Sequence, residues 1–207
     1  MSRLCRVLLI AIVALGVAAP SAGAVPDKKL GDYLGAMWET VLETPNSQST
    51  LPCVDLGGVV APLSVTGGDI ECTVKPGTKI FVAAWSVECS TFEAPPFFGS
   101  NERELRACAD LINTGVTVEA ALDGVPVNLT RVTSGLLRIA LPQDNILGVP
   151  GPQTGLSFAD GFVALLHPLT PGTHTITLRT EFPKGNVLFP DGNVIANTTT
   201  IIVQPGL

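Results

Sequence analysis

Alternating apolar and polar positions predict strands along most of this chain. Residues 161–167 are almost wholly apolar, as expected of a strand covered on both faces. Residues 173–180 place apolar side chains at every second position, as a strand with one exposed face does. Pro171 and Gly172 lie between these two runs and favour a tight turn. We therefore expect residues 161–180 to form a strand, a turn and a second strand.

Similar short runs recur on both sides of this segment. Asp123-Gly124 separates two of them and suits a type I′ hairpin turn. Together the runs supply enough strands for two packed sheets. The additional strands are predicted at residues 59–65, 78–87, 115–122, 125–132, 136–141 and 194–203.

A helical period appears only near the start of the chain. Apolar residues at 3.6-residue spacing predict an amphipathic helix over residues 28–42, with Asp27 as its N-cap and Pro45 beyond its end. Tyr33 and Trp38 lie on the apolar stripe, where core packing is a more common role than ligand binding. The predicted fold is therefore all-β: a two-sheet β-sandwich, Ig-like or jelly-roll-like, with one N-terminal amphipathic helix.

Residues 1–24 have the pattern of a secretory signal peptide. Arg3 and Arg6 precede an apolar run, and Ala22-Gly23-Ala24 supplies the small residues of a cleavage site. We expect a secreted, extracellular protein whose residues 25–207 form a single domain. No transmembrane segment is expected after cleavage, because no second apolar run of about 20 residues follows.

The charge of the chain argues against two classes of partner. The chain has 12 basic and 18 acidic residues, and the predicted signal removes two arginines and no acid, which leaves a net charge of −8. An acidic domain with scattered charges is a poor ligand for nucleic acid or for an anionic membrane surface.

Four cysteines follow the predicted signal, at positions 53, 72, 89 and 108. An even number in an exported chain predicts two disulfides, each contributing about 3 kcal/mol through loop closure. Three pairings are possible. We favour the sequential one, Cys53 with Cys72 and Cys89 with Cys108, and the spacing does not suit a metal site.

Two irregular stretches, residues 89–108 and 142–158, are the places where a ligand surface is most easily built. The first holds three phenylalanines beside Pro95-Pro96 and a charged run suited to a helical turn, and the second holds an acid and an amide. The simpler interpretation, which we favour, is a disulfide-pinned loop packed on a sheet edge. The candidate ligand surface consists of Phe92, Phe97, Phe98, Asp144 and Asn145.

Catalytic motifs are absent from the sequence: it has no GxSxG, HExxH, Walker or GxGxxG pattern. We predict no catalytic residue, no cofactor and no metal site. A carbohydrate-directed hydrolase with a carboxylate pair stays an alternative, because only the spacing of two acids in space is diagnostic. Its candidate acids are Glu88, Glu93, Glu119 and Asp160. A calcium-supported adhesion module is a further alternative, and would need Asp144, Asn145, Asp160 and Asp191 to converge.

The order Leu169, Gly172, His174 is similar to the tyrosine corner of β-sandwiches, with histidine in the place of tyrosine. We expect one ring nitrogen of His174 to bond a backbone group of the same turn. Because no acid lies beside it in sequence, burial should lower its pKa. A metal site built on His167 and His174 would need a third ligand from elsewhere.

Four stretches of the chain resemble a family of secreted bacterial and fungal β-sandwich proteins for which no activity is established. They are Trp38, residues 72–81, residues 118–126 around Asp123-Gly124, and residues 160–176. The resemblance covers most of the mature chain and implies the fold, but brings no catalytic residues. Asn128 and Asn197 begin glycosylation sequons, which matter only in a eukaryotic host.

The sequence therefore favours a secreted, non-catalytic binding or envelope-associated module. Its expected partner is an extracellular protein or glycan.

The first testable prediction concerns export. Intact-mass measurement of secreted material should give a chain that begins at Val25, and iodoacetamide without reductant should find no free thiol. A mass that retains residues 1–24, or a chain that reacts with iodoacetamide, would contradict it.

Overall fold

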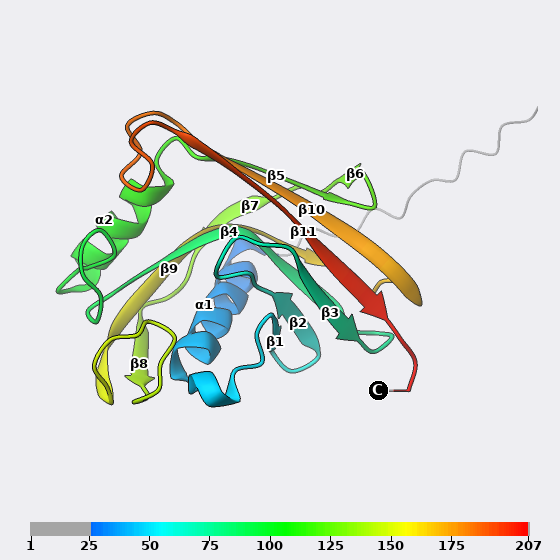
Figure 1. Ribbon diagram of the computed structural model, residues 1–207, viewed down its shortest axis with the longest axis horizontal. Helices are drawn as coiled ribbons and strands as arrows, with labels where there is room; N and C mark the ends of the chain where they lie inside the picture. The colour runs from blue at the N-terminus through cyan, green and yellow to red at the C-terminus, as the bar shows by residue number, and fades with distance from the viewer. Residues whose placement is uncertain (1–25, 207) are drawn as a thin grey trace, which may run out of the picture.

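Two β-sheets and two helices make up the computed structural model, which describes residues 26–206 (Figure 1). The predicted signal peptide and Val25 lie outside the described residues. The first sheet has the order β1-β2-β4-β9-β7, with β8 also paired to β9, and the second has the order β3-β11-β10-β5-β6. The predicted two-sheet sandwich is confirmed.

The first sheet comprises β1 (Cys53–Asp55), β2 (Val59–Pro62), β4 (Lys79–Ser90), β7 (Thr130–Thr133), β8 (Leu137–Leu141) and β9 (Gln153–Leu166). The second comprises β3 (Ile70–Val74), β5 (Thr117–Leu122), β6 (Val125–Pro126), β10 (Gly172–Phe182) and β11 (Asn193–Val203).

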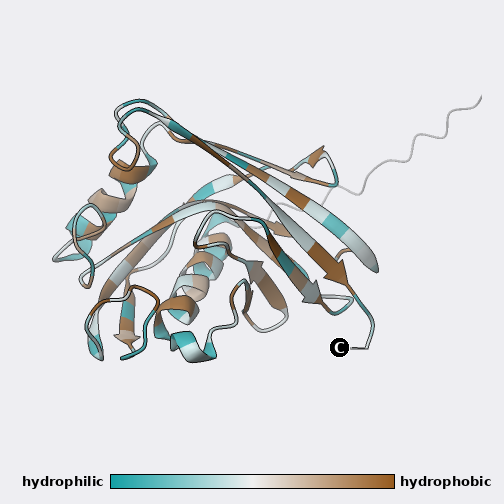
Figure 2. Ribbon diagram, in the orientation of Figure 1, coloured by the Kyte–Doolittle hydropathy of each residue, from teal (hydrophilic) through white to brown (hydrophobic). Residues whose placement is uncertain are grey.

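The longest ladder of the first sheet joins β4 and β9 in antiparallel register, from Ile80 opposite Leu166 to Ser90 opposite Ser157. Both strands are covered on both faces over most of their length, which explains the apolar run at residues 161–167. Figure 1 shows helix α1 below this sheet and the second sheet above it. Figure 2 shows the apolar stretches of α1 and of the strands that it faces.

Helix α1 (Asp27–Glu43) covers the lower face of the first sheet. Leu34 and Met37 are fully buried in a core cluster with Phe81 of β4 and Val163 of β9. The predicted helix is confirmed, but Asp27 is not its cap. The N-cap position is Pro26, and no side chain caps this end of the helix.

A second helix, α2 (Glu102–Asn113), occupies the charged run for which only a helical turn was expected. The side chain of its N-cap, Asn101, accepts a hydrogen bond from the backbone N–H of Glu104. Leu105 and Ile112 are fully buried against β4 and β9. The sequence pattern did not indicate a full helix, because the apolar stripe is narrow and the remaining positions are charged or small. A single 3-10 turn, η1 (Asn46–Gln48), follows α1.

Two disulfides form in the predicted sequential pairing. Cys53 bonds Cys72 and joins β1 to β3, which connects the two sheets. Cys89 bonds Cys108 and joins β4 to α2. The two covalent links therefore lie at opposite ends of the fold.

The strand, turn and second strand predicted at residues 161–180 are present, but the two strands do not pair with each other. The two strands belong to different sheets, so residues 167–171 carry the chain across the sandwich. Strand β9 also begins at Gln153, inside the stretch 142–158 that was expected to be a loop, because β8 and β4 pair with this polar segment. The short strands β1 and β3 were not predicted.

The predicted hairpin at Asp123-Gly124 is confirmed. Both residues have positive φ, 49° and 80°, as a type I′ turn requires. The turn joins β5 to β6, with Leu122 opposite Val125.

Two glycines of α1 give a test of how closely the helix lies on the sheet. A Cβ at Gly31 would collide with the backbone carbonyl oxygen of Thr133, whereas a Cβ at Gly35 would meet the flexible Leu137 side chain at 3.3 Å. We expect Gly31→Ala to lower the free energy of unfolding by about 1–3 kcal/mol through overpacking. Gly35→Ala should stay within about 1 kcal/mol of the parent, because alanine favours the helix.

Urea unfolding of the mature domain, followed by circular dichroism, measures both changes. Equal effects of the two substitutions would show that α1 does not approach β7 as closely as described.

Candidate functional site

A cavity of about 430 Å³ opens where β2 separates from β4. Strand β2 pairs with β4 at only two positions, Val59 opposite Lys79 and Val60 opposite Ile80. Beyond them the chain turns away toward β3, and the inner faces of β10 and β11 form the opposite wall. The cavity volume lies in the range of about 300–1,000 Å³ that is usual for small-ligand sites.

An irregularity in β4 decides which side chains line this cavity. The register between β4 and β9 shifts between Ala83 and Trp85, as at a β-bulge. Before the shift, the odd-numbered Phe81 and Ala83 pack toward α1. After it, the even-numbered Ser86 takes that side, where its hydroxyl accepts a hydrogen bond of 3.3 Å from the Trp38 indole. Bulges re-aim side chains in this way.

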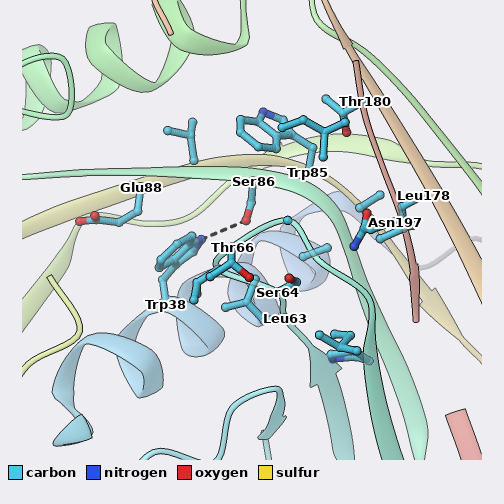
Figure 3. A pocket seen from close by; sticks show the side chains of 18 of the residues that line it. Trp38, Leu63, Ser64, Thr66, Trp85, Ser86, Glu88, Leu178, Thr180 and Asn197 are labelled. Atoms are coloured by element: carbon cyan, nitrogen blue, oxygen red, sulfur yellow. Dashed lines mark hydrogen bonds between the residues drawn. The ribbon is translucent and has the colours of Figure 1, made fainter. Parts of the chain in front are cut away.

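Figure 3 shows the outcome of this shift. Trp38 and Glu88 lie on one side of β4, and Trp85 lies on the other beside Thr180. The Trp85 indole donates a hydrogen bond of 2.7 Å to the side-chain oxygen of Asn113 in α2, and its ring packs edge-on against Phe182. The cavity therefore has two indoles in its wall, each held in place by a hydrogen bond.

Two glutamates supply the acidic part of the cavity wall. Glu88 is only 5% exposed and accepts a short hydrogen bond from the Ser157 hydroxyl, and Glu93 accepts one of 3.0 Å from Ser90. Burial, followed by the charge of Glu93, raises the pKa of Glu88 well above its usual value. Burial also raises the pKa of Glu93. The two carboxyl groups affect each other's pKa, so the pair favours a form in which a proton is retained.

This pair fulfils one condition of the hydrolase alternative. Two carboxyl groups with raised pKa values do share a cavity. Glycosidases, however, hold their two carboxyl groups about 5–9.5 Å apart, with the scissile bond between them. Glu88 and Glu93 lie close enough for the charge of Glu93 to raise the pKa of Glu88. A carboxyl group that retains its proton can donate a hydrogen bond, and an ionised one attracts a cation.

The five residues of the candidate ligand surface lie in different surroundings. Phe97 is half-buried and lines the cavity. Phe92 packs against a small buried cluster that consists of Leu42, Ile139 and Leu141. Phe98 is 43% exposed. Asp144 accepts a hydrogen bond from the backbone N–H of Ser47.

The fifth residue, Asn145, is buried inside its own loop. Its amide group donates to the carbonyls of Pro142 and Val149, at 3.0 and 2.9 Å, and accepts from the Val149 N–H. Of the five, only Phe97 faces the cavity. A ligand surface that includes the other four stays a prediction.

The remaining candidate acids are dispersed. Asp160 forms a two-point ion pair with Arg131, at 2.6 and 3.0 Å, and Glu119 lies exposed on β5. Among residues 26–206, no group of three or more histidine, cysteine, aspartate or glutamate side chains could hold a metal ion. Asp160, one of the four residues that the calcium alternative needs, is bonded to Arg131 instead.

His174 confirms one expectation and corrects another. Its Nε2 lies 2.9 Å from the carbonyl oxygen of Thr170, as expected of a corner residue. The expected fall in its pKa was wrong: a hydrogen bond to Asp123, with Nδ1 2.7 Å from the carboxylate, raises the pKa. Pairing of β5 with β10 brings this acid from 51 residues away, which sequence proximity could not indicate. Protonation of His174 therefore favours folding, and this stabilisation is lost as the pH rises through the folded pKa.

Several cavity residues were missed by sequence reasoning. Trp85 was part of a predicted strand, and Trp38 was assigned to the core. One signal was present: Ser86, Glu88 and Ser90 place polar groups at every second position after an apolar run. Asn197, of the second sequon, also lines the cavity.

Comparison with known proteins adds little to this geometry. No protein-family model and no curated protein sequence matches the chain. Three solved structures are weakly similar. Amebosin is 14% identical over 70% of this chain and 96% of its own, with a TM-score of 0.27. The cysteine protease inhibitor EhICP2 from Entamoeba histolytica is 15% identical over 70% and 94%, with a TM-score of 0.28. PbICP-C, solved in complex with falcipain-2, is 10% identical over 72% and 98%, with a TM-score of 0.25. Similarities this low carry no argument about function.

The raised pKa of Glu88 predicts that this side chain lowers the free energy of unfolding as the pH rises. A carboxyl group whose folded pKa is raised stabilises the fold below its unfolded pKa of about 4.3, and this stability is lost as the pH rises through the folded value. Glu88→Gln removes the ionisation. Relative to the parent, the variant should therefore become progressively more stable when unfolding is measured at increasing pH, from about pH 4.5 to about pH 8.

Urea unfolding across this pH range measures the difference, and the exposed Glu119→Gln provides the matched control. A Glu88→Gln curve parallel to that of the parent would contradict the assignment.

Proposed function

We propose that this chain is a secreted, non-catalytic binding module that holds its ligand in the cavity beside β4. The observation that carries the proposal is the Glu88–Glu93 carboxyl pair, which lies in the wall of a cavity with two indoles. Binding sites are commonly apolar cavities with a few convergent polar groups and perturbed pKa values. The pair is held by Ser90 and Ser157, which orient it before a ligand arrives.

An extracellular location fits the chemistry of the chain. The two disulfides are typical of oxidising compartments, and they join the signal-like pattern of residues 1–24 in favouring export. In the described part of the chain, no helix is both long enough and apolar enough to cross a membrane.

Neighbouring positions on β11 allow a matched test of the cavity. Asn197 faces the cavity, whereas Ala196 is exposed and points to the opposite face. The mature domain, Asn197→Trp and Ala196→Trp should be applied to arrays of extracellular peptides and glycans. We expect at least one ligand that the parent and Ala196→Trp bind equally and that Asn197→Trp binds at least about tenfold more weakly.

Circular dichroism and melting temperature establish that both variants fold. Ligands that bind all three proteins equally would place the binding site elsewhere. Cleavage of an arrayed glycan by the parent, lost in Glu88→Gln, would replace the binding role with the hydrolase alternative.

A further inference from the structure

The cavity contains an unpaired length of strand edge. Within residues 26–206, β4 has no neighbouring strand on the side away from β9 between Ile80 and Ser90. There the N–H of Ser90 donates to Phe97, and the Ser90 carbonyl accepts from Gly99. The edge between these two contacts borders the cavity, which is lined by residues 83–88 of β4.

The direction of the backbone groups along this edge follows from the hydrogen bonds of its neighbours. In an antiparallel pair, residues alternate between bonding the partner strand and pointing away from it. Ser90 points away from β9, as its bonds to Phe97 and Gly99 show. Glu88 and Ser86 lie two and four residues earlier, after the bulge, and therefore point the same way.

A second observation on the opposite strand agrees with this direction. Ala159, which lies opposite Glu88, accepts a hydrogen bond at its carbonyl from the Ser134 N–H on the far side of β9. Glu88 and Ala159 thus form a pair whose backbone groups do not bond each other. Within residues 26–206, the backbone N–H and C=O groups of Ser86 and Glu88 therefore point away from β9, and no backbone group of a turn or loop bonds them.

The charge on this part of the cavity has one sign. Among the described residues that line the cavity, only Glu88 and Glu93 have ionisable side chains. Side chains of a strand added beside β4 would lie on the same face as their opposite neighbours, about 4.5–5.5 Å apart between Cβ atoms. A basic side chain opposite Glu88 would lie next to the carboxyl pair and close to the Trp38 indole.

We propose that the ligand is an extended, basic peptide segment that adds a strand to the open edge of β4 at Ser86 and Glu88. This inference rests on the proposed binding function. The backbone of the peptide bonds the free N–H and C=O groups, in the manner of β-strand addition at other sheet edges. A lysine or arginine of the peptide lies opposite Glu88. The loop after β2 and the faces of β10 and β11 form the walls around the peptide.

The probe for this proposal is a library of seven-residue peptides that alternate threonine and valine around a central lysine. The tightest member is remade with backbone N-methyl groups on one alternate set of residues, and separately on the other set. Only one set can face β4. We expect one methylated peptide to bind at least about tenfold more weakly and the other to bind like the parent peptide. Replacing the lysine with norleucine should also weaken binding.

The protein provides a matched pair of variants. Ser86→Pro removes the outward N–H without removing a bond to β9, whereas Ser86→Ala keeps it; both lose the hydroxyl that Trp38 bonds. Because both variants lose the hydroxyl, the comparison is between them: we expect Ser86→Pro to bind the peptide at least about tenfold more weakly than Ser86→Ala does. Amide hydrogen exchange of the parent gives a readout without a variant, since the bound peptide should slow exchange at Ser86 and Glu88 about tenfold or more.

Two results would overturn the proposal. One is that no library member binds the folded parent with a dissociation constant below about 1 mM. The other is that both methylated peptides bind like the unmodified one. If a glycan binds instead, and Asn197→Trp weakens it, the binding function stands and strand addition is wrong.

Discussion

The antiparallel pairing of β4 with β9 is the interaction on which the rest of this fold depends. Each strand is buried on both faces, so each face needs its own covering layer. Helix α1 covers one face around Phe81 and Val163, and the second sheet covers the other around Ile80 and Val82. Burying each large apolar side chain contributes about 1.5–3 kcal/mol, so loss of either layer would expose an uncompensated apolar face.

The bulge at Ala84 determines which side chains of β4 line the cavity. Without the extra residue, the polar positions after the apolar run would point toward β10 and α2, where Val87 and Cys89 now pack. With it, Glu88 points to the side of α1, beyond the end of β2. The same change places Trp85 between Asn113 and Phe182. One inserted residue thus determines both the composition of the core near α2 and that of the cavity.

Local patterns in the sequence predicted much of the fold. These features depend on residues close in sequence or on the even number of cysteines: the apolar stripe of α1, most strands, the Asp123-Gly124 turn and the disulfide pairing. The partition of β9 and β10 between two sheets was not predictable in this way, because the turn at Pro171-Gly172 is compatible with a hairpin or with a crossover. The site was less predictable still. The interaction of Glu88 and Glu93 requires the chain to fold back after Ser90, and the Asp123–His174 contact requires the pairing of β5 with β10.

The carboxyl pair and the open edge are connected by a physical constraint. An unpaired strand edge is a template for aggregation, and proteins protect such edges with charged residues, prolines or covering loops. Here Phe97–Gly99 cover the edge at Ser90, Pro95-Pro96 precede that cover, and Glu88 and Glu93 place acid beside the part that stays open. The burial that raises the pKa of Glu88 destabilises the fold at neutral pH, so the pair reduces stability while it protects the edge. An acidic edge repels further copies of this acidic chain, yet it attracts a segment of opposite charge. The feature that limits unspecific strand pairing is therefore the same feature that would select a basic partner.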